Sequence, residues 1–149
     1  MSDGYLTDDE YVAAYGKVPR LCVDLVIRNE QYEHGSVLLT RRTQKPHVGW
    51  WHIPGGRVRK GESVYQAAHR IAVTELGADV EIGNTLGFIE FLDDPGDLVV
   101  CHSVSIALSC RLLEQIQSPN FAWFDHVPTE EMHPVHQRFL QQQVKEKSE

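Results

Sequence analysis

The segment from Gly55 to Gly77 constrains the fold of this 149-residue chain more than any other segment. It begins with a pair of glycines, where the backbone can turn freely and approach other groups closely. Apolar residues then recur at helical spacing, at Val64, Ala67, Ala68, Ile71, Ala72 and Leu76. Because Gly77 is a typical helix stop signal, the pattern predicts a loop that leads into a helix over residues 62–76.

Runs of β-branched and apolar residues on both sides of this helix predict strands. They cover residues 20–27, 36–42, 50–53, 80–91, 98–112 and 121–124, with a turn over 93–97. Two further helices are expected, one from Thr7 to about Gly16 and one after Thr129. This order predicts an α/β fold, with a mixed sheet between helices on both faces. No repeat or linker divides the chain, so we expect one domain over 1–149, with a helical extension over 1–18 and a frayed tail over 145–149.

Composition and charge exclude several classes of protein. Hydrophobic residues make up 42% of the chain, enough for one core without disulfides or a structural metal. A net charge of −7 opposes non-specific binding to nucleic acid or to an anionic membrane. The odd number and wide spacing of Cys22, Cys101 and Cys110 argue against a disulfide framework and a thiolate zinc site. The N-terminus lacks a secretory pattern and no apolar run approaches the roughly 20 residues that span a bilayer, so a cytoplasmic location is expected.

Charged residues along the loop and helix suggest chemistry. Along the sequence, Gly56 is followed by Glu62, Arg70, Glu75 and Gly77. A glycine loop that leads into a helix bearing an arginine and a glutamate can place a carboxylate beside a phosphate-bound cation. The segment is therefore a candidate metal site.

The spacing of these residues resembles the Nudix box. Gly56, five residues, Glu62, seven residues and Arg70 match its first half, and Glu75, Gly77 and the aliphatic position at Ala78 match its second. The resemblance implies a Nudix hydrolase fold that binds Mg²⁺ through helix carboxylates. It makes Glu75 the metal ligand and gives Gly56, Gly77, Glu62 and Arg70 the role of supporting the motif.

The box departs from the usual pattern at two positions, where Ile71 and Thr74 replace glutamates. Ile71 and Glu75 are neighbours on one helix face, so the loss leaves too few anionic oxygens for several Mg²⁺ ions. We therefore expect one Mg²⁺ per chain, which Mn²⁺ could replace. This reduced box, together with residues 38–43, 49–51 and 54–58, is similar to the GDP-mannose mannosyl hydrolase branch, which cleaves a sugar carbon–oxygen bond.

That branch implies a nucleoside diphosphate sugar as substrate, GDP-mannose or a related GDP-hexose, and release of the sugar and GDP. By resemblance, the Mg²⁺ ligands are the Gly55 carbonyl, the Glu75 carboxylate and the Gln117 amide. Asp24, Arg42 and Arg57 match positions near the nucleotide sugar, where the arginines stabilise the leaving diphosphate. A homodimer is also expected, both from the branch and from the aromatic residues Tyr15, Trp50 and Trp51.

One match fails, because Ser118 stands where the branch has a histidine that acts as general base. His102 or His126 could take that role, while His133 and His136, on a terminal helix, are interpreted as surface residues. Two alternatives therefore stay open. One is cleavage of a phosphoanhydride bond, as in ADP-ribose hydrolysis, and the other is a nucleotide-binding Nudix protein without turnover.

Overall fold

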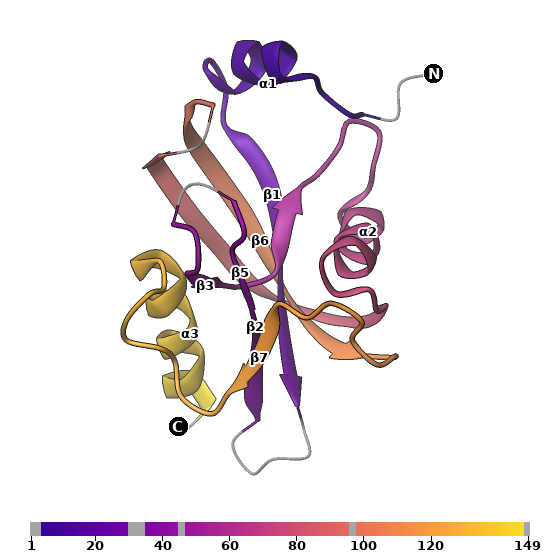
Figure 1. Ribbon diagram of the computed structural model, residues 1–149, viewed down its shortest axis with the longest axis vertical. Coiled ribbons are helices and arrows are strands. Elements are labelled where there is room, and N and C mark those ends of the chain that lie inside the picture. Colours follow the sequence, from indigo (N-terminus) through magenta and orange to yellow (C-terminus); the bar gives the residue numbers. More distant parts are fainter. Residues whose placement is uncertain (1–3, 30–34, 45–46, 96–97, 148–149) are drawn as a thin grey trace.

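The structure, a computed structural model, describes residues 4–29, 35–44, 47–95 and 98–147. Figure 1 shows the elements that these residues form. In chain order they are α1 (Asp8–Tyr15), β1 (Arg20–Asn29), β2 (Ser36–Arg41), β3 (Trp51–His52), β4 (Gly55–Arg57), α2 (Val64–Leu76), β5 (Val80–Pro95), β6 (Val100–Leu112), β7 (Phe121–Phe124) and α3 (Pro134–Lys147).

The strands form one mixed sheet. Its main path has the order β3-β2-β1-β6-β5, while β4 pairs with β1 and β7 pairs with β2. The β1–β6 pairing is parallel, with Arg20 beside Ser103 and Asp24 beside Ala107, and the other pairings are antiparallel. The mixed sheet predicted from the sequence is therefore confirmed.

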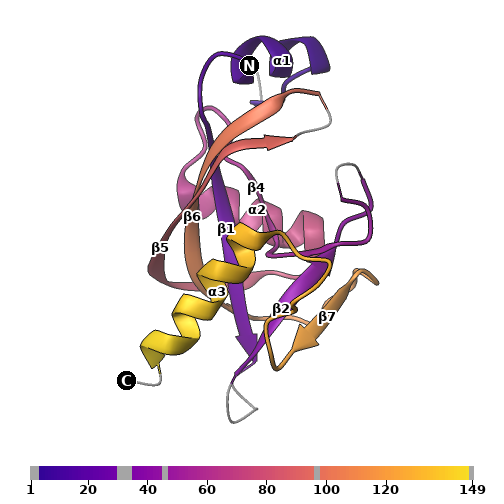
Figure 2. The same ribbon diagram turned by 90° about the vertical axis from the view of Figure 1, so that its left-hand side faces the viewer.

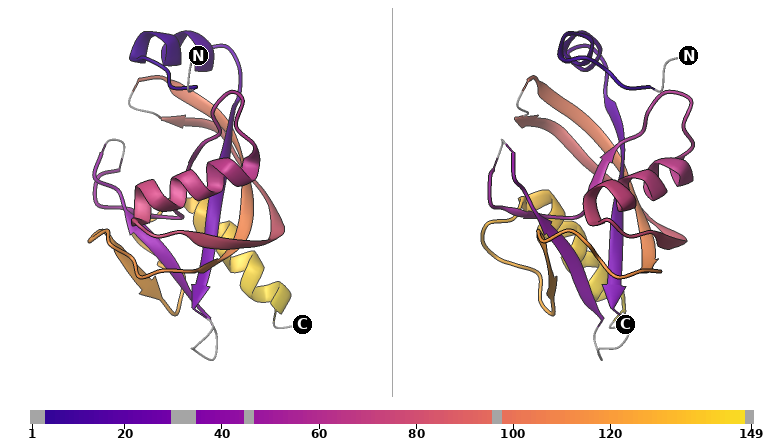
Figure 3. Two further views of the ribbon diagram at one scale, coloured as in Figure 1. Left: turned by 90° about the vertical axis from the view of Figure 1, so that its right-hand side faces the viewer. Right: turned by 45° about the vertical axis from the view of Figure 1, so that its right-hand side comes forward.

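Different helices cover the two faces of this sheet, as Figures 2 and 3 show. Val23, Leu25 and Ile27 of β1 join the core under α2, whereas Val26 joins the core that includes Leu140 of α3. This division follows from the strand itself, because successive side chains point to opposite faces. The predicted arrangement of helices on both faces of the sheet is confirmed.

Local sequence explains where α2 begins and ends. The Ser63 hydroxyl accepts the N–H of Gln66, and the Gln66 side chain accepts the N–H of Ser63. This capping box starts the helix at Val64, two residues after the predicted start. Gly77 ends it with φ at 65°, in the left-handed region that favours glycine.

Two other boundaries also differ from the prediction. The glycine pair that was expected in a loop belongs to β4, because its backbone pairs with Val23 and Asp24 of β1. β5 continues to Pro95, with an irregular register against β6 between Phe91 and Asp94. Residues 96–97 of the predicted turn lie outside the described residues.

The two terminal helices differ in their packing. No residue of α1 is fully buried, whereas α3 contributes Leu140 to the core. The helical backbone of α3 continues to Lys147, into the tail that was expected to fray from Lys145, so fraying there stays a prediction. Among the described residues, no helix has both the length and the apolar character needed to cross a membrane.

The aromatic residues behind the expected homodimer do not form an exposed patch. Tyr15, Trp50 and Trp51 are each half-buried, and the ring of Trp51 lies edge-on to Phe124 with centroids 4.9 Å apart. A homodimer stays a prediction on the resemblance alone. Light scattering tests it, since a mass of one chain at high concentration would refute it.

Candidate active site

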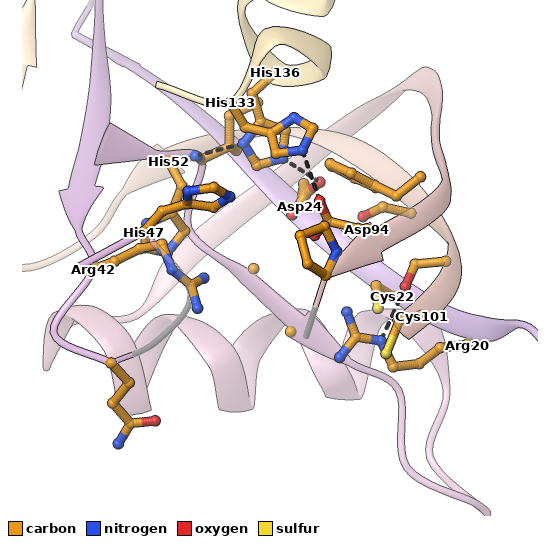
Figure 4. Close-up of a pocket in the computed structure, with 18 of the residues that line it drawn as sticks. Arg20, Cys22, Asp24, Arg42, His47, His52, Asp94, Cys101, His133 and His136 are labelled. Carbon is orange, nitrogen blue, oxygen red and sulfur yellow. Dashed lines mark hydrogen bonds and ion pairs between the residues drawn. The ribbon is translucent and has the colours of Figure 1, made fainter. Parts of the chain in front are cut away.

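A cavity of about 510 Å³ lies beside β1 and β6, and Figure 4 shows many of the residues that line it. Its walls come from segments that are far apart in sequence, including α1, the loop before β3, the end of α2 and the start of α3. We call this cavity the cleft. Its polar lining includes Asp8, Tyr11, Arg20, Asp24, Arg42, Gln44, His47, His52, Glu75, Asp94, Ser103, Ser105, His133 and His136.

The alternation of strand residues places one face of β1 along the cleft. Arg20, Cys22 and Asp24 all line it, at intervals of two residues. Cys101, Ser103 and Ser105 do the same on the neighbouring strand β6, where Ser103 lies beside Arg20 and Ser105 beside Cys22. The sheet therefore supplies a wall of charged, hydroxyl and thiol groups.

Three buried side-chain atoms in the cleft have no hydrogen-bond partner among the described residues. They are Asp24 Oδ2, His52 Nδ1 and Ser105 Oγ, and each belongs to a residue that lines the cavity. Burying a polar group without a hydrogen bond is unfavourable. Such groups, gathered in one cavity, are suited to bind a ligand.

Asp24 fits its place because residue 55 is a glycine. A Cβ at Gly55 would collide with Asp24 Oδ1 and would lie 2.7 Å from the carbonyl oxygen of Val23. At Gly56, by contrast, an added Cβ would be 3.4 Å from Ile71, an ordinary contact. The glycine pair therefore permits β4 to lie against the carboxylate of a buried aspartate.

Glu75 comes to the cleft from the last turn of α2. Its side chain is half-buried, and burial raises its pKa while the charge of Arg42 has the opposite effect. Arg42, Gly55 and Gly56 line the same cavity. The structure thus brings together Arg42, Gly55 and Glu75, three of the residues that the family resemblance assigns to a metal or a phosphate.

Glu62, which lies just before α2, forms a tight pair with Arg70 in the middle of the helix. Arg70 donates from Nε and Nη2 to the two carboxylate oxygens of Glu62 at 2.7 and 2.9 Å, and also to the carbonyl of Arg57 at 2.8 Å. Glu62 accepts the N–H of Arg59 at 2.9 Å. Because of the hydrogen bonds from Arg70, the pKa of Glu62 falls to about 2. Neither residue lines the cleft.

Other residues expected at the site lie elsewhere. Arg57 Nη2 donates to the carbonyl of Gly4 at 2.8 Å, and Arg57 does not line the cavity. The exposed Gln117 packs on Gly77 and donates to the carbonyl of Gln115 at 3.4 Å. Local packing at the end of α2, including the bond from Gln117 N–H to the carbonyl of Leu76, keeps it there.

The two histidines considered as bases are not in the cleft lining either. His102 lies between Cys101 and Ser103, both of which line the cavity, so strand alternation directs its side chain to the other face of the sheet. His126 is exposed and outside the cavity, and Ser118 Oγ accepts the N–H of Asn120 at 3.3 Å. None of His102, His126 and Ser118 therefore lines the cleft.

His136, interpreted from sequence as a surface residue, is buried and lines the cleft. Its Nδ1 accepts the backbone N–H of Ile53 at 3.3 Å. Its Nε2 lies 3.4 Å from Asp24 Oδ2, within ion-pair distance but without the geometry of a hydrogen bond, as drawn in Figure 4. A neutral ring that accepts at Nδ1 carries its proton on Nε2. His136 thus connects α3, the segment before β4 and the cleft face of β1.

His133 is held in the same way and is only about a quarter exposed. Its Nδ1 accepts the N–H of Val135 at 3.1 Å, and its Nε2 lies 2.8 Å from Asp94 Oδ1. The surface interpretation missed both histidines because their partners are remote in sequence. The only signal available was their i, i+3 spacing, which places two side chains on one side of a helix start.

Comparison with known proteins identifies relatives of this chain. Residues 18–148 match the model of the NUDIX domain. The chain is 35% identical over 142 residues to the "Low-salt glycan biosynthesis protein Agl8" of Haloferax volcanii, which covers 91% of this chain and 88% of the relative.

Solved structures show the same fold. The MutT protein from Methanosarcina mazei Go1 has a TM-score of 0.73 and 22% identity, covering 89% of this chain and 99% of that one. The NUDIX domain of Shewanella oneidensis NrtR, in a cocrystal with ADP ribose, has a TM-score of 0.64 and 21% identity, covering 97% and 100%. With the domain match over most of its length and the Haloferax relative, the chain belongs to the Nudix family.

Proposed function

We propose that the protein hydrolyses a nucleoside diphosphate sugar, with GDP-mannose or a related GDP-hexose as the first substrate to test. Water would attack the sugar carbon, the bond from that carbon to the diphosphate oxygen would break, and the products would be free sugar and GDP. A nucleotide sugar is supported by the Haloferax relative, which is named for glycan biosynthesis and aligns over nearly all of both chains. The cavity also has the size of a typical small-molecule site.

The observation that carries the choice of bond is that Glu75 is the one carboxylate of the described α2 residues to line the cleft. Ile71, at a position where the family usually has glutamate, is buried in the core, and Thr74 is exposed. Attack on phosphorus by a hydroxide held between metals needs several anionic ligands. When a diphosphate leaves carbon, the metal has only to neutralise its charge, which one Mg²⁺ can do.

The cleft residues fit a single divalent ion. Glu75 offers a carboxylate and Gly55 a backbone carbonyl, and both are hard oxygen donors of the kind that Mg²⁺ prefers. Among the described residues, no three or more His, Cys, Asp or Glu side chains are grouped as ligands for a metal. The protein would therefore supply few of the Mg²⁺ ligands, and the diphosphate and water would supply the others. A bound Mg²⁺ would supply positive charge to the diphosphate.

Arg42 has the chemistry to assist the leaving group. Arg42 lines the same cavity as Glu75, and its charge acts to lower the pKa of that carboxyl against the effect of burial. A guanidinium can donate two parallel hydrogen bonds to phosphate oxygens. We assign Arg42 to the diphosphate and Asp24 to the sugar part of the ligand.

His47 is the strongest candidate for the general base among the four cleft histidines. Burial lowers the pKa of His52 to about 4, which makes it a weak proton acceptor. In His133 and His136 one ring nitrogen accepts a backbone N–H and the other faces a carboxylate. His47 has φ at 60°, a strained value of the kind that often occurs at functional sites, and its ring stacks on Trp50.

Replacing this histidine tests its role. We expect His47→Gln to lower kcat by roughly 100-fold or more while GDP binds as before. His69→Gln is the matched control, because His69 is exposed on α2 and pairs with Asp79 outside the cleft. An unchanged kcat in His47→Gln would remove it from the mechanism.

A product analysis tests the proposed reaction. Purified protein with Mg²⁺ is incubated with GDP-mannose, other nucleotide sugars and ADP-ribose, and the products are identified. Free sugar and a nucleoside diphosphate support the proposal. Sugar phosphate and a nucleoside monophosphate would establish phosphoanhydride cleavage instead, and binding without any product would identify a non-catalytic Nudix protein.

A further inference from the structure

Arg20, labelled in Figure 4, is a second arginine of the cleft and contacts Tyr11 of α1. Its Nε donates to Ser103 Oγ at 3.1 Å and its Nη1 donates to the hydroxyl of Tyr11 at 2.6 Å. A guanidinium has five N–H donors, so these contacts use two of them. Among the described residues, no partner is found for the other three.

The surroundings of Arg20 leave its charge uncompensated. Within the described part of the chain, no carboxylate lies at ion-pair distance from it. Burial raises the pKa of Tyr11 and raises that of Cys22 to about 11, so both neighbours keep their protons at neutral pH. Because a half-buried cation is normally paired, this side chain is suited to bind an anion.

A second donor lies beside it on the sheet. Ser105 is adjacent to Cys22 in the β1–β6 register, two residues beyond Ser103. Its hydroxyl is buried, lines the cleft and has no partner among the described residues. Arg20 and Ser105 together therefore offer N–H and O–H donors to the same part of the cavity.

Arg57 does not supply this charge. Its guanidinium donates to the carbonyls of Gly4 and Val58, at 2.8 and 3.4 Å, and it is not part of the cleft lining. Of the arginines and lysines that the structure describes, those lining the cleft are Arg20 and Arg42. A diphosphate in the cleft would therefore meet Arg20 and not Arg57.

We propose that Arg20 and Ser105 form a second oxyanion subsite, which binds a phosphate oxygen of the substrate's diphosphate in the role that family resemblance gives to Arg57. The inference rests on the proposed function, because it takes a nucleoside diphosphate as the ligand. Arg42 and Glu75 hold one part of the diphosphate, and the subsite holds the part nearer α1.

Calorimetric titration with GDP and Mg²⁺ tests the subsite. We expect Arg20→Gln to weaken GDP binding by about tenfold or more, the usual cost of a charged hydrogen-bond partner. Arg57→Gln should bind GDP as the wild type does. Arg28→Gln is the matched control, because Arg28 is a half-buried arginine of the same strand that donates to the Gly35 carbonyl outside the cleft.

Two more variants separate binding from folding. Tyr11→Phe removes the hydroxyl that contacts Arg20 but keeps the guanidinium, so GDP affinity should fall much less than in Arg20→Gln. Ser105→Ala is a minimal change, and we expect it to weaken GDP binding by a few-fold. If Arg20→Gln proves unfolded, wild-type affinity in Ser105→Ala overturns the subsite.

Different results would overturn the subsite and the proposed function. GDP affinity that is unchanged in Arg20→Gln, or that falls more in Arg57→Gln, would overturn the subsite while the proposed function stands. A loss in Tyr11→Phe equal to that in Arg20→Gln would show that Arg20 only anchors α1. Wild-type protein that binds no nucleoside diphosphate would overturn the proposed function itself.

Discussion

The charged residues at the two ends of the Nudix-box segment around α2 have different surroundings. At the start of the helix, Glu62 is held by Arg70 from the middle of α2, and both residues also bind the backbone of the glycine-rich segment. Near the end of α2, Glu75 enters a cleft where buried polar atoms have no hydrogen-bond partner among the described residues. A satisfied pair contributes to stability, whereas unsatisfied groups are available to a ligand. One short motif thus combines an internal ion pair with the end of α2 at which we propose that the ligand binds.

The largest effect should come from the binding end. Glu75→Gln replaces the carboxylate by an amide, a weaker Mg²⁺ ligand, so turnover should fall by at least about 100-fold while the fold is retained. Glu81→Gln is the control, because Glu81 forms an exposed pair with Arg111 away from the cleft. Steady-state rates and melting temperatures measure both. Wild-type rates in Glu75→Gln would remove Glu75 from the site.

The next largest effect is expected at the glycine pair, where substitutions at Gly55 and Gly56 should differ in their effects on stability and turnover. Gly55→Ala forces a methyl group against Asp24, so we expect a stability loss of about 1–3 kcal/mol together with a loss of turnover. Gly56→Ala meets only Ile71 at 3.4 Å and should cost less than about 1 kcal/mol. Urea denaturation and turnover assays compare them. Equal behaviour of the two variants would contradict the close approach of β4 to Asp24.

A smaller effect, on stability more than on chemistry, is expected at the end with the ion pair. Glu62→Gln weakens the contact with Arg70 and should destabilise the fold by about 1–2 kcal/mol at pH 7. Because the pKa of Glu62 lies at about 2 in the fold and near 4.5 otherwise, this contribution is complete above pH 4.5 and disappears towards pH 2. Denaturation of both proteins across that range should show the difference shrinking, and a constant difference would exclude the ionised pair as its source.

Metal stoichiometry gives a finer test of the binding end. With Ile71 and Thr74 in place of glutamates, α2 offers one carboxylate to the cleft, so we predict one Mg²⁺ per chain in the substrate complex. Titration of Mn²⁺ in the presence of GDP, followed by paramagnetic resonance, counts the ions. Two or three protein-bound ions along α2 would refute the one-metal mechanism.

Local patterns predict the parts of the molecule that depend on near neighbours. Helical spacing located α2, and strand alternation places Asp24 towards the cleft. The same alternation could have identified Arg20, four residues earlier on the same face of β1. Contacts between distant segments carry no such local signal. This explains why the burial of His136 against Asp24, and the displacement of Arg57 towards Gly4, emerge only in the folded chain.

The central claim is that water attacks the sugar carbon of a nucleoside diphosphate sugar, and isotope labelling tests it most directly. GDP-mannose is hydrolysed with Mg²⁺ in water enriched in oxygen-18, and the products are weighed by mass spectrometry. We predict one heavy oxygen in the free sugar and none in GDP. Heavy oxygen in a phosphate-containing product, whether GMP, GDP or mannose phosphate, would contradict cleavage of the carbon–oxygen bond.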